Sequence, residues 1–410
     1  MIRRITVAFV ISLMLTGLLR ADEKESSFGI RFSGFVKTDG IWDTRQTVAA
    51  REGHFLLYPA GPKKDQNGDD INAKVNFNIL AIQTRLKGSI TGPDAFGAKT
   101  SGLIEAAFFG TTEGDVNGFR LRHAILTLAW KQSSLMIGQF WHPMFVTSCF
   151  PGTVSFNTGA PFQPFSRNPQ IRWTYKSGNA RLLAAAIAQR DFMSTGPQGA
   201  GTMYLRNSAI PNMHLQLQWE SEKTILGIGG DWKTLTPRIE TSAGYKSTST
   251  VSSLAALAFA RFNFPTFVCK LEGVYGQNMY DHLMLGGYGV ESIAANTGME
   301  TYSPSSVFSA WTDIETGKEF GFGLFAGVTQ NLGTDSDLLD VQNGYWARAG
   351  NIDMMYRVAP RLIWNSAKTR FAVETEYTAA SYGSIESNAT VKDTEFVGNF
   401  RLLLAAYYFF

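Results

Sequence analysis

Basic side chains dominate one long stretch of this sequence, and carboxylates are absent from it. No Asp or Glu occurs between Asp115 and Asp191, where the basic residues are Arg120, Arg122, Lys131, Arg167, Arg172, Lys176, Arg181 and Arg190. Charges of one sign along a low-dielectric passage concentrate counter-ions. The chemistry that this stretch predicts is the attraction of anions, with no bond made or broken.

Residues that could catalyse a reaction or hold a metal do not form a recognisable site in the sequence. The five histidines are His54, His123, His142, His214 and His282, and they match no metal-ligand spacing. The sequence contains no Gly-x-Ser-x-Gly nucleophile elbow. The acidic run 65–70 lacks the closing Glu of an EF-hand loop. We therefore predict no enzyme activity, no catalytic residue, no metal and no cofactor.

Alternation of apolar and polar residues predicts β-strands as the elements that position these charges. Three segments alternate strictly, with apolar sets Ile171/Trp173/Tyr175, Met213/Leu215/Leu217/Trp219 and Phe371/Val373/Tyr377. The opposite faces carry Arg172 and Lys176, His214 and Glu220, and Glu374 and Glu376. A face that carries charges costs too much to bury unpaired, so we expect it to meet water.

The last strand extends this pattern from Thr394 to Phe410. Phe396, Phe400, Leu402, Leu404, Ala406, Tyr408 and Phe410 share one face, and Glu395, Asn399 and Arg401 lie on the other. One lipid-facing side, one wet side and an aromatic end are typical of a membrane barrel. The segment also resembles the carboxy-terminal signature of bacterial outer-membrane barrels, in which alternating apolar positions finish on Phe.

Connection lengths predict the topology. Short connections at 131–134, 177–180, 220–223, 263–265, 315–319 and 365–368 alternate with long ones at 141–169, 193–211, 234–252, 277–305, 331–349 and 381–393, after a first long one at 44–70. Short periplasmic turns and long external loops alternate in this way in barrels. We predict an all-β fold, a transmembrane antiparallel β-barrel of about sixteen strands that leaves an aqueous channel, with fourteen or eighteen left open.

The third long connection, 141–169, is unusually apolar for an exposed loop, with several Phe and Pro residues. Such a segment favours folding inward against the barrel wall, as the third external loop of trimeric porins does. The resemblance in position suggests an inward-folded loop that constricts the channel. The alternative is a loop buried in a subunit interface.

The amino-terminal segment predicts export. Arg3 and Arg4 precede the apolar residues 5–19, and Ala21 offers a small residue for cleavage. We expect residues 1–21 to be a cleaved signal peptide and residues 22–410 to form a single barrel domain, inserted from the periplasm into a Gram-negative outer membrane. Cys149 and Cys269 would then meet an oxidising compartment, and whether they pair is left open.

Basic residues on strands are the candidates for the channel lining. Arg167, Arg172 and Lys176 are the first candidates, Arg120 and Arg122 follow, and Lys37, Arg85 and Arg401 complete the set. The alternative is that some of these side chains lie at the rim and never reach the channel. Glu374, Glu376 or the pair Lys270 and Glu272 could also offset the positive field from the opposite wall.

Three segments resemble DcaP-like porins. These are Phe28 to Asp39 with its Gly-Phe-Val-Lys-x-Asp run, the segment Phe119-Arg120-Leu121-Arg122-His123-Ala124, and Gly138-Gln139-Phe140-Trp141. The resemblance covers about a quarter of the chain. It implies a sixteen-stranded trimeric outer-membrane porin for small hydrophilic, including anionic, solutes.

The sequence therefore predicts passive diffusion of small hydrophilic solutes with a preference for anions. Expected partners are those solutes, outer-membrane lipid with lipopolysaccharide, and two further copies in a homotrimer, but no nucleic acid. The competing hypothesis is an adhesin or structural barrel with a plugged lumen. A barrel enzyme is the least favoured, because no Ser/His or paired-carboxylate site can be assembled.

Overall fold

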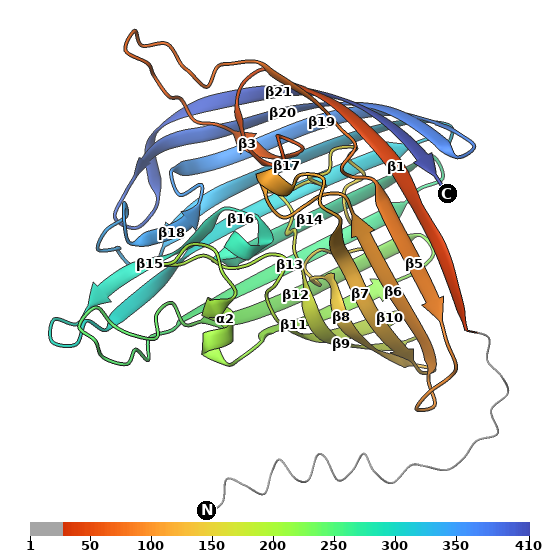
Figure 1. Cartoon of the computed structure of the whole chain (residues 1–410), viewed down its shortest axis with the longest axis horizontal. Coiled ribbons are helices and arrows are strands. Elements are labelled where there is room, and N and C mark those ends of the chain that lie inside the picture. Colours follow the sequence, from red (N-terminus) through yellow and green to blue (C-terminus); the bar gives the residue numbers. More distant parts are fainter. Residues whose placement is uncertain (1–27) are drawn as a thin grey trace, which may run out of the picture.

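Sixteen antiparallel strands close into one barrel in the computed structural model, which describes residues 28–410 (Figure 1). The predicted signal peptide, residues 1–21, lies outside the described residues. None of the helices within residues 28–410 is long and apolar enough to cross a membrane. The all-β prediction and the count of sixteen strands are confirmed.

The first half of the wall is built from short to medium strands. In chain order they are β1 (Gly29–Asp43), β4 (Asn76–Leu80) continued by β5 (Arg85–Thr91), β6 (Lys99–Ala107), β7 (Arg120–Ala129), β8 (Ser133–Trp141), β9 (Arg167–Ser177), β10 (Ala180–Ile187) and β11 (Asn212–Glu220). Because β4 and β5 both pair with β1, they act as one interrupted strand.

Apart from β1 and the interrupted β4–β5 strand, no strand of the first half is longer than those of the second half. The strands of the second half are β12 (Thr224–Leu235), β13 (Val251–Asn263), β14 (Phe267–Gln277), β16 (Glu300–Thr316), β17 (Phe320–Thr334), β19 (Ile352–Ser366), β20 (Thr369–Ile385) and β21 (Val391–Phe409). Outside the barrel ladder lie the hairpin of β2 (Thr47–Ala50) and β3 (Phe55–Pro59), the strands β15 (Gly286–Ile293) and β18 (Tyr345–Arg348), and the short helices η1 (Glu113–Asp115), α2 (Met203–Ser208) and η2 (Met279–His282).

The first and last strands close the barrel. β1 pairs with β21 in a register that runs from Phe35 opposite Phe409 to Asp43 opposite Arg401. At that end of the seam Arg401 donates from Nε to Asp43 Oδ1 at 2.9 Å and from Nη2 to Oδ2 at 2.6 Å. A bidentate, buried pair of this kind is among the stronger charged contacts in proteins, so it fixes the register of closure.

The wall is apolar outside and polar inside, as the alternation predicts. On β11, Leu215 is 58% exposed while its neighbour His214 is 3% exposed. On β20, Phe371 and Val373 are exposed while Glu374 is fully buried. On β21 the exposed face carries Phe396, Phe400, Leu404 and Tyr408, and Phe410 directly after the strand is exposed too, in agreement with the predicted lipid-facing side.

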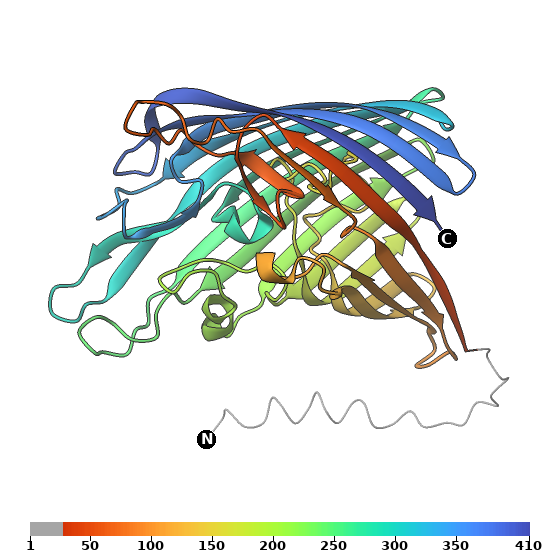
Figure 2. The ribbon, with the colours of Figure 1, turned by 45° about the horizontal axis from the view of Figure 1, so that its top comes forward.

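Short and long connections gather at opposite ends of the barrel (Figures 1 and 2). The six predicted short turns all join neighbouring strands of the wall. The connection between β5 and β6 is residues 92–98, because the two strands pair as far as Thr91 and Ser101. The first long connection contains the β2–β3 hairpin, which the alternation analysis did not predict.

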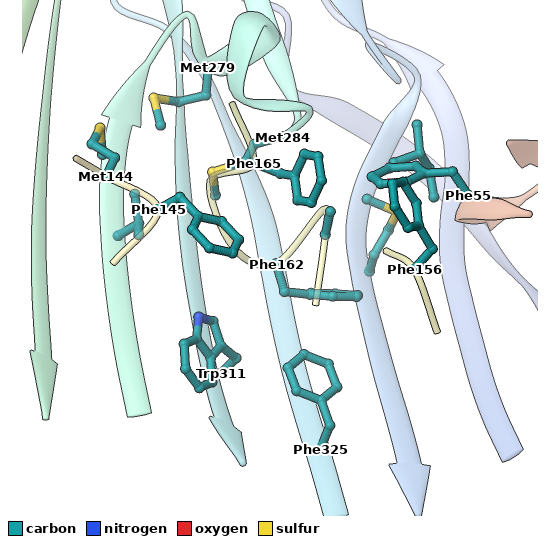
Figure 3. Packing of buried hydrophobic residues seen from close by; sticks show 14 of the residues in the cluster. Phe55, Met144, Phe145, Phe156, Phe162, Phe165, Met279, Met284, Trp311 and Phe325 are labelled. Atoms are coloured by element: carbon teal, nitrogen blue, oxygen red, sulfur yellow. The ribbon is translucent and has the colours of Figure 1, made fainter. Parts of the chain in front are cut away.

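A large apolar cluster occupies the barrel interior (Figure 3). Phe145, Phe156, Phe162 and Phe165 of the third long connection meet side chains from the walls and from other connections. These side chains include Phe55 of β3, Met279 and Met284 near η2, Trp311 of β16 and Phe325 of β17. The expectation that the polar inner face meets water is therefore wrong over this part of the wall.

Arginines and carboxylates buried beside this cluster form ion pairs, which lowers the cost of burying them. Arg361 donates to both carboxylate oxygens of Asp313, at 2.6 and 3.0 Å. Arg357 lies 3.3 Å from Glu376. Paired and hydrogen-bonded charges avoid most of the cost that an isolated buried charge would carry.

An arginine on the outer face of β11 should destabilise the barrel in lipid. Leu215→Arg replaces an outward side chain near the middle of its strand, where a cation costs about 2–4 kcal/mol if the position lies at the bilayer midplane. Chemical unfolding in lipid vesicles measures the loss, with Leu215→Phe as the control that keeps an apolar side chain. Equal stability of the two variants would contradict the outward placement of Leu215.

Candidate functional site

The third long connection, residues 142–166, is held against the far side of the barrel by hydrogen bonds from its backbone. Val154 N and Ser155 N donate to the two carboxylate oxygens of Glu374 on β20, at 2.7 and 2.8 Å. Val154 O accepts a 2.8 Å hydrogen bond from Lys37 Nζ on β1. The connection starts after β8 and ends at β9, so these contacts cross the interior from one wall to another.

Further contacts attach the same segment to β16 and β19. Gly152 N donates to Asp313 Oδ2 at 2.9 Å, and Arg357 Nη1 donates to the carbonyl oxygen of Ala160 at 2.8 Å. Ser309 Oγ donates to Phe162 O at 2.8 Å. A buried loop must satisfy its free backbone groups, and inward wall side chains supply the partners here.

The β2–β3 hairpin lies inside the barrel beside this segment. All five residues of β3 are buried, and Arg357 Nη2 donates to Leu57 O at 2.8 Å. Tyr382 on β20 donates from its hydroxyl to Pro59 O at 2.7 Å. Phe55 packs edge-on against Phe165 with ring centroids 5.1 Å apart, which joins the hairpin to the 142–166 segment.

A cavity of about 560 Å³, which we call the arginine chamber, remains among the long connections. Its basic lining residues are Arg51, Arg120, Arg167, Arg190 and Arg348, and its one carboxylate is Asp191. Aromatic walls come from Phe55, Phe109, Phe156, Phe165 and Phe192. The chamber thus combines a positive charge excess with aromatic surface.

Asp191 neutralises part of this charge by binding two arginines. Arg167 Nε donates to Asp191 Oδ2 at 2.9 Å, and Arg120 pairs with the other carboxylate oxygen. Arg167 also stacks over Trp141, 5.2 Å from the ring centroid, and is 2% exposed. Its Nη1 is buried and has no hydrogen-bond partner among the described residues, so it retains donor capacity.

The other chamber arginines come from connections or their edges. Arg51 Nε donates to Gly110 O at 2.8 Å, and Arg348 lies 4.3 Å from the ring centroid of Tyr280. Partial burial lowers the pKa of Arg51 from its usual value, and Glu113 and Asp115 oppose this effect. Arg190 is exposed. With one aspartate against five arginines, the lining keeps a positive excess.

The predicted channel-lining residues lie in different parts of the structure. Arg120 and Arg167 line the chamber. Arg172 donates to Trp141 O at 2.6 Å and to Gln170, and Lys176 is exposed at the short-turn end of β9. Neither Arg172 nor Lys176 borders the chamber.

The remaining predicted residues form ion pairs. Arg122 Nε donates to Glu105 Oε1 at 2.8 Å, and Arg85 lies 3.5 Å from the same carboxylate. Lys37 pairs with Asp39 at 2.9 Å, and Arg401 with Asp43. The pairing carboxylates lie outside the acid-free stretch, so that stretch alone could not reveal them.

The carboxylates expected to oppose the basic wall have local partners. Glu374 binds the 142–166 backbone, Glu376 pairs with Arg357, and Lys270 pairs with Glu315 at 2.7 Å. Glu272 accepts a 3.2 Å hydrogen bond from Trp311 Nε1. Each of these four carboxylate or ammonium groups has such a partner within the barrel.

Sequence reasoning missed Arg51, Arg348 and the inward hairpin. Arg51 and Arg348 belong to long connections or their short strands, where alternation carries no information about direction. The signal for the hairpin was the apolar run Phe55-Leu56-Leu57-Tyr58 inside a supposed external loop. Such a run in a loop predicts burial for the same reason as the Phe-rich 142–166 segment.

The two cysteines are free, and their contacts indicate packing. Cys149 Sγ lies 3.3 Å from Ala260 O. Burial, and to a lesser extent the Glu272 carboxylate, raise the pKa of the Cys149 thiol to about 12. The thiol therefore stays protonated at neutral pH, and a thiolate nucleophile is not formed there.

Comparison with known sequences gives no match: no protein-family profile fits the chain, and no curated protein resembles it in sequence. Solved structures do match. The fold is that of the outer-membrane porins, since an anion-selective porin from Comamonas acidovorans aligns over 94% of this chain and all of its own, at 9% identity and a TM-score of 0.54.

Two further structures share this fold. The outer-membrane channel DcaP of Acinetobacter baumannii aligns over 96% of this chain and 100% of its own, with a TM-score of 0.67 and 16% identity. OmpT of Vibrio cholerae aligns over 95% and 99%, with a TM-score of 0.55 and 10% identity. The predicted resemblance to DcaP-like porins is thus confirmed at the level of fold.

Replacing the carboxylate that holds the 142–166 backbone should destabilise the folded barrel. Glu374→Gln keeps the shape but offers one acceptor oxygen to two backbone N–H groups, and leaving one of them unpaired costs about 1–3 kcal/mol. Guanidinium unfolding in vesicles measures the change. The control Glu319→Gln alters an exposed turn, and an equal effect of both substitutions would contradict the anchoring role.

Proposed function

We propose that this chain is an outer-membrane porin through which small hydrophilic solutes diffuse passively, with a preference for anions. The observation that carries this proposal is the arginine chamber, in which five arginines face one aspartate. A positive excess in a low-dielectric passage lowers the free energy of an anion relative to a cation. The porin fold supports the passive, non-enzymatic part of the proposal.

The chamber offers an anion both charge and a free donor. Arg167 Nη1 is buried and has no hydrogen-bond partner in the part of the chain that the structure describes, and the aromatic rings beside it provide a surface for the apolar part of a solute. A carboxylate or phosphate oxygen could accept a charge-assisted hydrogen bond from this guanidinium. Anionic solutes that carry some apolar surface therefore match the lining best.

The 142–166 segment and the β2–β3 hairpin set the width of the passage in this proposal. Both lie in the interior and are fixed to β1, β16, β19 and β20 by the contacts described above. Their fixed position would keep the aperture narrow and the chamber arginines close to a passing solute. Selectivity then depends on aperture and wall charge, with no cofactor.

The expected assembly and route also belong to the proposal. We infer export by cleavage after Ala21, insertion into the outer membrane beside lipopolysaccharide, and assembly as a homotrimer. A trimeric form of OmpT from Vibrio cholerae shares the fold, which supports the oligomer. Exposed outer-face residues such as Phe371 and Leu404 suit contact with lipid or a neighbouring subunit.

A barrel whose interior is plugged, and which acts through its loops, is the second candidate function. The observation that favours it is the apolar cluster that joins the hairpin, the 142–166 segment and η2 inside the barrel. Planar bilayers separate the two candidates. A porin gives ion conductance after reconstitution of the mature chain, whereas a plugged barrel that inserts equally well gives none.

Removing chamber arginines should weaken anion preference. In a salt gradient across a planar bilayer, the wild-type reversal potential should favour chloride over potassium. A chamber charge about 8 Å from the ion path changes the energy of either ion by about 0.5 kcal/mol in water, with opposite signs for chloride and potassium, so Arg190→Gln should lower the chloride-to-potassium permeability ratio about fivefold. Arg167→Gln should act in the same direction.

Two arginines serve as controls for this experiment. Arg206→Gln alters an exposed residue of α2, and Arg172→Gln alters a strand residue that does not border the chamber. Both should leave the ratio near its wild-type value. Cation preference in the wild type, or a larger effect of Arg172→Gln than of Arg167→Gln, would contradict the chamber as the source of selectivity.

A further inference from the structure

Three of the five histidines converge inside the barrel although they are far apart in the sequence. His142 begins the 142–166 segment, His214 lies on β11, and His282 ends η2. The ring centroid of His142 is 4.6 Å from that of His282 and 5.8 Å from that of His214. All three side chains are at most 3% exposed.

Asp231 on β12 completes the cluster. One potential ligand atom from each of His142, Asp231 and His282 lies within 4.8 Å of the others. Ligands of one tetrahedral zinc ion, at bond lengths near 2.1 Å, stand about 3.4 Å apart. Side-chain rotations that move each ligand atom by about 1 Å would bring the three onto a single ion.

Two polar atoms of the cluster lack a hydrogen-bond partner among the described residues. His282 Nδ1 and Asn212 Oδ1 are buried without a partner among the described residues. His142 Nδ1 accepts a hydrogen bond from Met144 N at 3.2 Å, so its Nε2 carries the ring proton. Asn212 Nδ2, itself a donor, lies 2.8 Å from that nitrogen.

Metal binding at Nε2 of His142 requires a change of the ring tautomer. A metal at Nε2 requires the proton on Nδ1, which gives up the contact with Met144 N at the long end of the hydrogen-bond range. The metal would then occupy the place of the Nε2 proton of His142, which faces the N–H of Asn212. The Asn212 amide nitrogen also donates to Asp231 Oδ1 at 3.4 Å, while its oxygen has no partner among the described residues.

Neighbouring groups hold the candidate ligands in place. His214 Nδ1 lies 3.1 Å from Asp231 Oδ1, and His214 Nε2 lies 3.0 Å from Gln216 Oε1. Such outer partners orient metal-binding carboxylates and imidazoles. The nearby cation Lys233 is paired with Asp281, which also accepts a 2.8 Å hydrogen bond from Gln189 Nε2. Its charge is therefore locally compensated.

We propose that His142, Asp231 and His282 bind one divalent transition-metal ion, with Zn²⁺ as the best-fitting species. Two imidazoles and one carboxylate favour borderline metals such as Zn²⁺, whereas Mg²⁺ and Ca²⁺ prefer oxygen ligands alone. The bound ion would tie the start of the 142–166 segment to the β12 wall and to η2. This site is separate from the arginine chamber and does not depend on solute passage.

Direct metal binding tests the site. Protein without a polyhistidine tag, refolded in detergent and stripped with a chelator, is dialysed against Zn²⁺ and its metal content measured by atomic emission. We expect one Zn²⁺ per chain. His282→Gln and Asp231→Asn should each weaken Zn²⁺ binding at least about tenfold, because each removes one of three ligands. Mg²⁺ at the same concentration should not bind.

His123→Gln is the matched control, because His123 is also buried but lies on β7 outside the cluster. It should bind Zn²⁺ as the wild type does, and the heat-modifiable gel mobility of each variant reports its folding. Absence of Zn²⁺ from folded wild-type protein at about 100 μM metal would overturn the proposal, whatever the variants do. Undiminished binding by folded His282→Gln and Asp231→Asn would overturn it as well.

Discussion

The interior of this barrel depends on an exchange of hydrogen bonds between charged wall side chains and the backbone of inserted segments. A loop inside a barrel has free N–H and C=O groups, and inward carboxylates and guanidinium groups need partners once water is displaced. Glu374 accepts from Val154 N and Ser155 N, while Arg357 donates to Ala160 O and to Leu57 O. The wall side chains and the inserted backbone thus satisfy each other's hydrogen bonds, which lowers the free-energy cost of burying both.

The apolar cluster and the arginine chamber both follow from this exchange. Once the 142–166 segment is fixed to β1, β16, β19 and β20, its Phe side chains fill the adjacent space together with Phe55 and η2. On the side of β7 and β9 the pairing is incomplete, because Asp191 binds two arginines and Arg167 Nη1 has no hydrogen-bond partner within residues 28–410. The positive excess, and with it the proposed anion preference, arises where the pairing falls short.

Much of the wall was predictable from the sequence, because an apolar outer face and a polar inner face impose a period of two on every strand. Leu215 and His214 face opposite sides of the wall for this reason. The strand count could be predicted because short turns mark where one strand ends and the next begins. The apolar 142–166 segment was recognisable by composition. The predicted export signal lies outside the residues that the structure describes, and the channel-lining residues remain a prediction.

Contacts between distant segments were not predictable from local patterns. The convergence of His142 and His282 depends on how a loop folds across the interior, and no spacing in the sequence encodes it. The partners of the basic residues, such as Glu105 for Arg122 and Asp43 for Arg401, come from other strands. The prediction that charged faces meet water was wrong because local sequence patterns do not show these partners or the inserted backbone.

Hydrogen exchange at two backbone amides tests the central claim most directly. In the folded barrel, Val154 N–H and Ser155 N–H donate to a buried carboxylate and should exchange as slowly as amides of the barrel strands. Amides in the exposed acidic loop 65–69 provide the fast reference. Slow exchange at residues 154 and 155 would support an inserted, wall-bound segment, and exchange as fast as in that loop would contradict it.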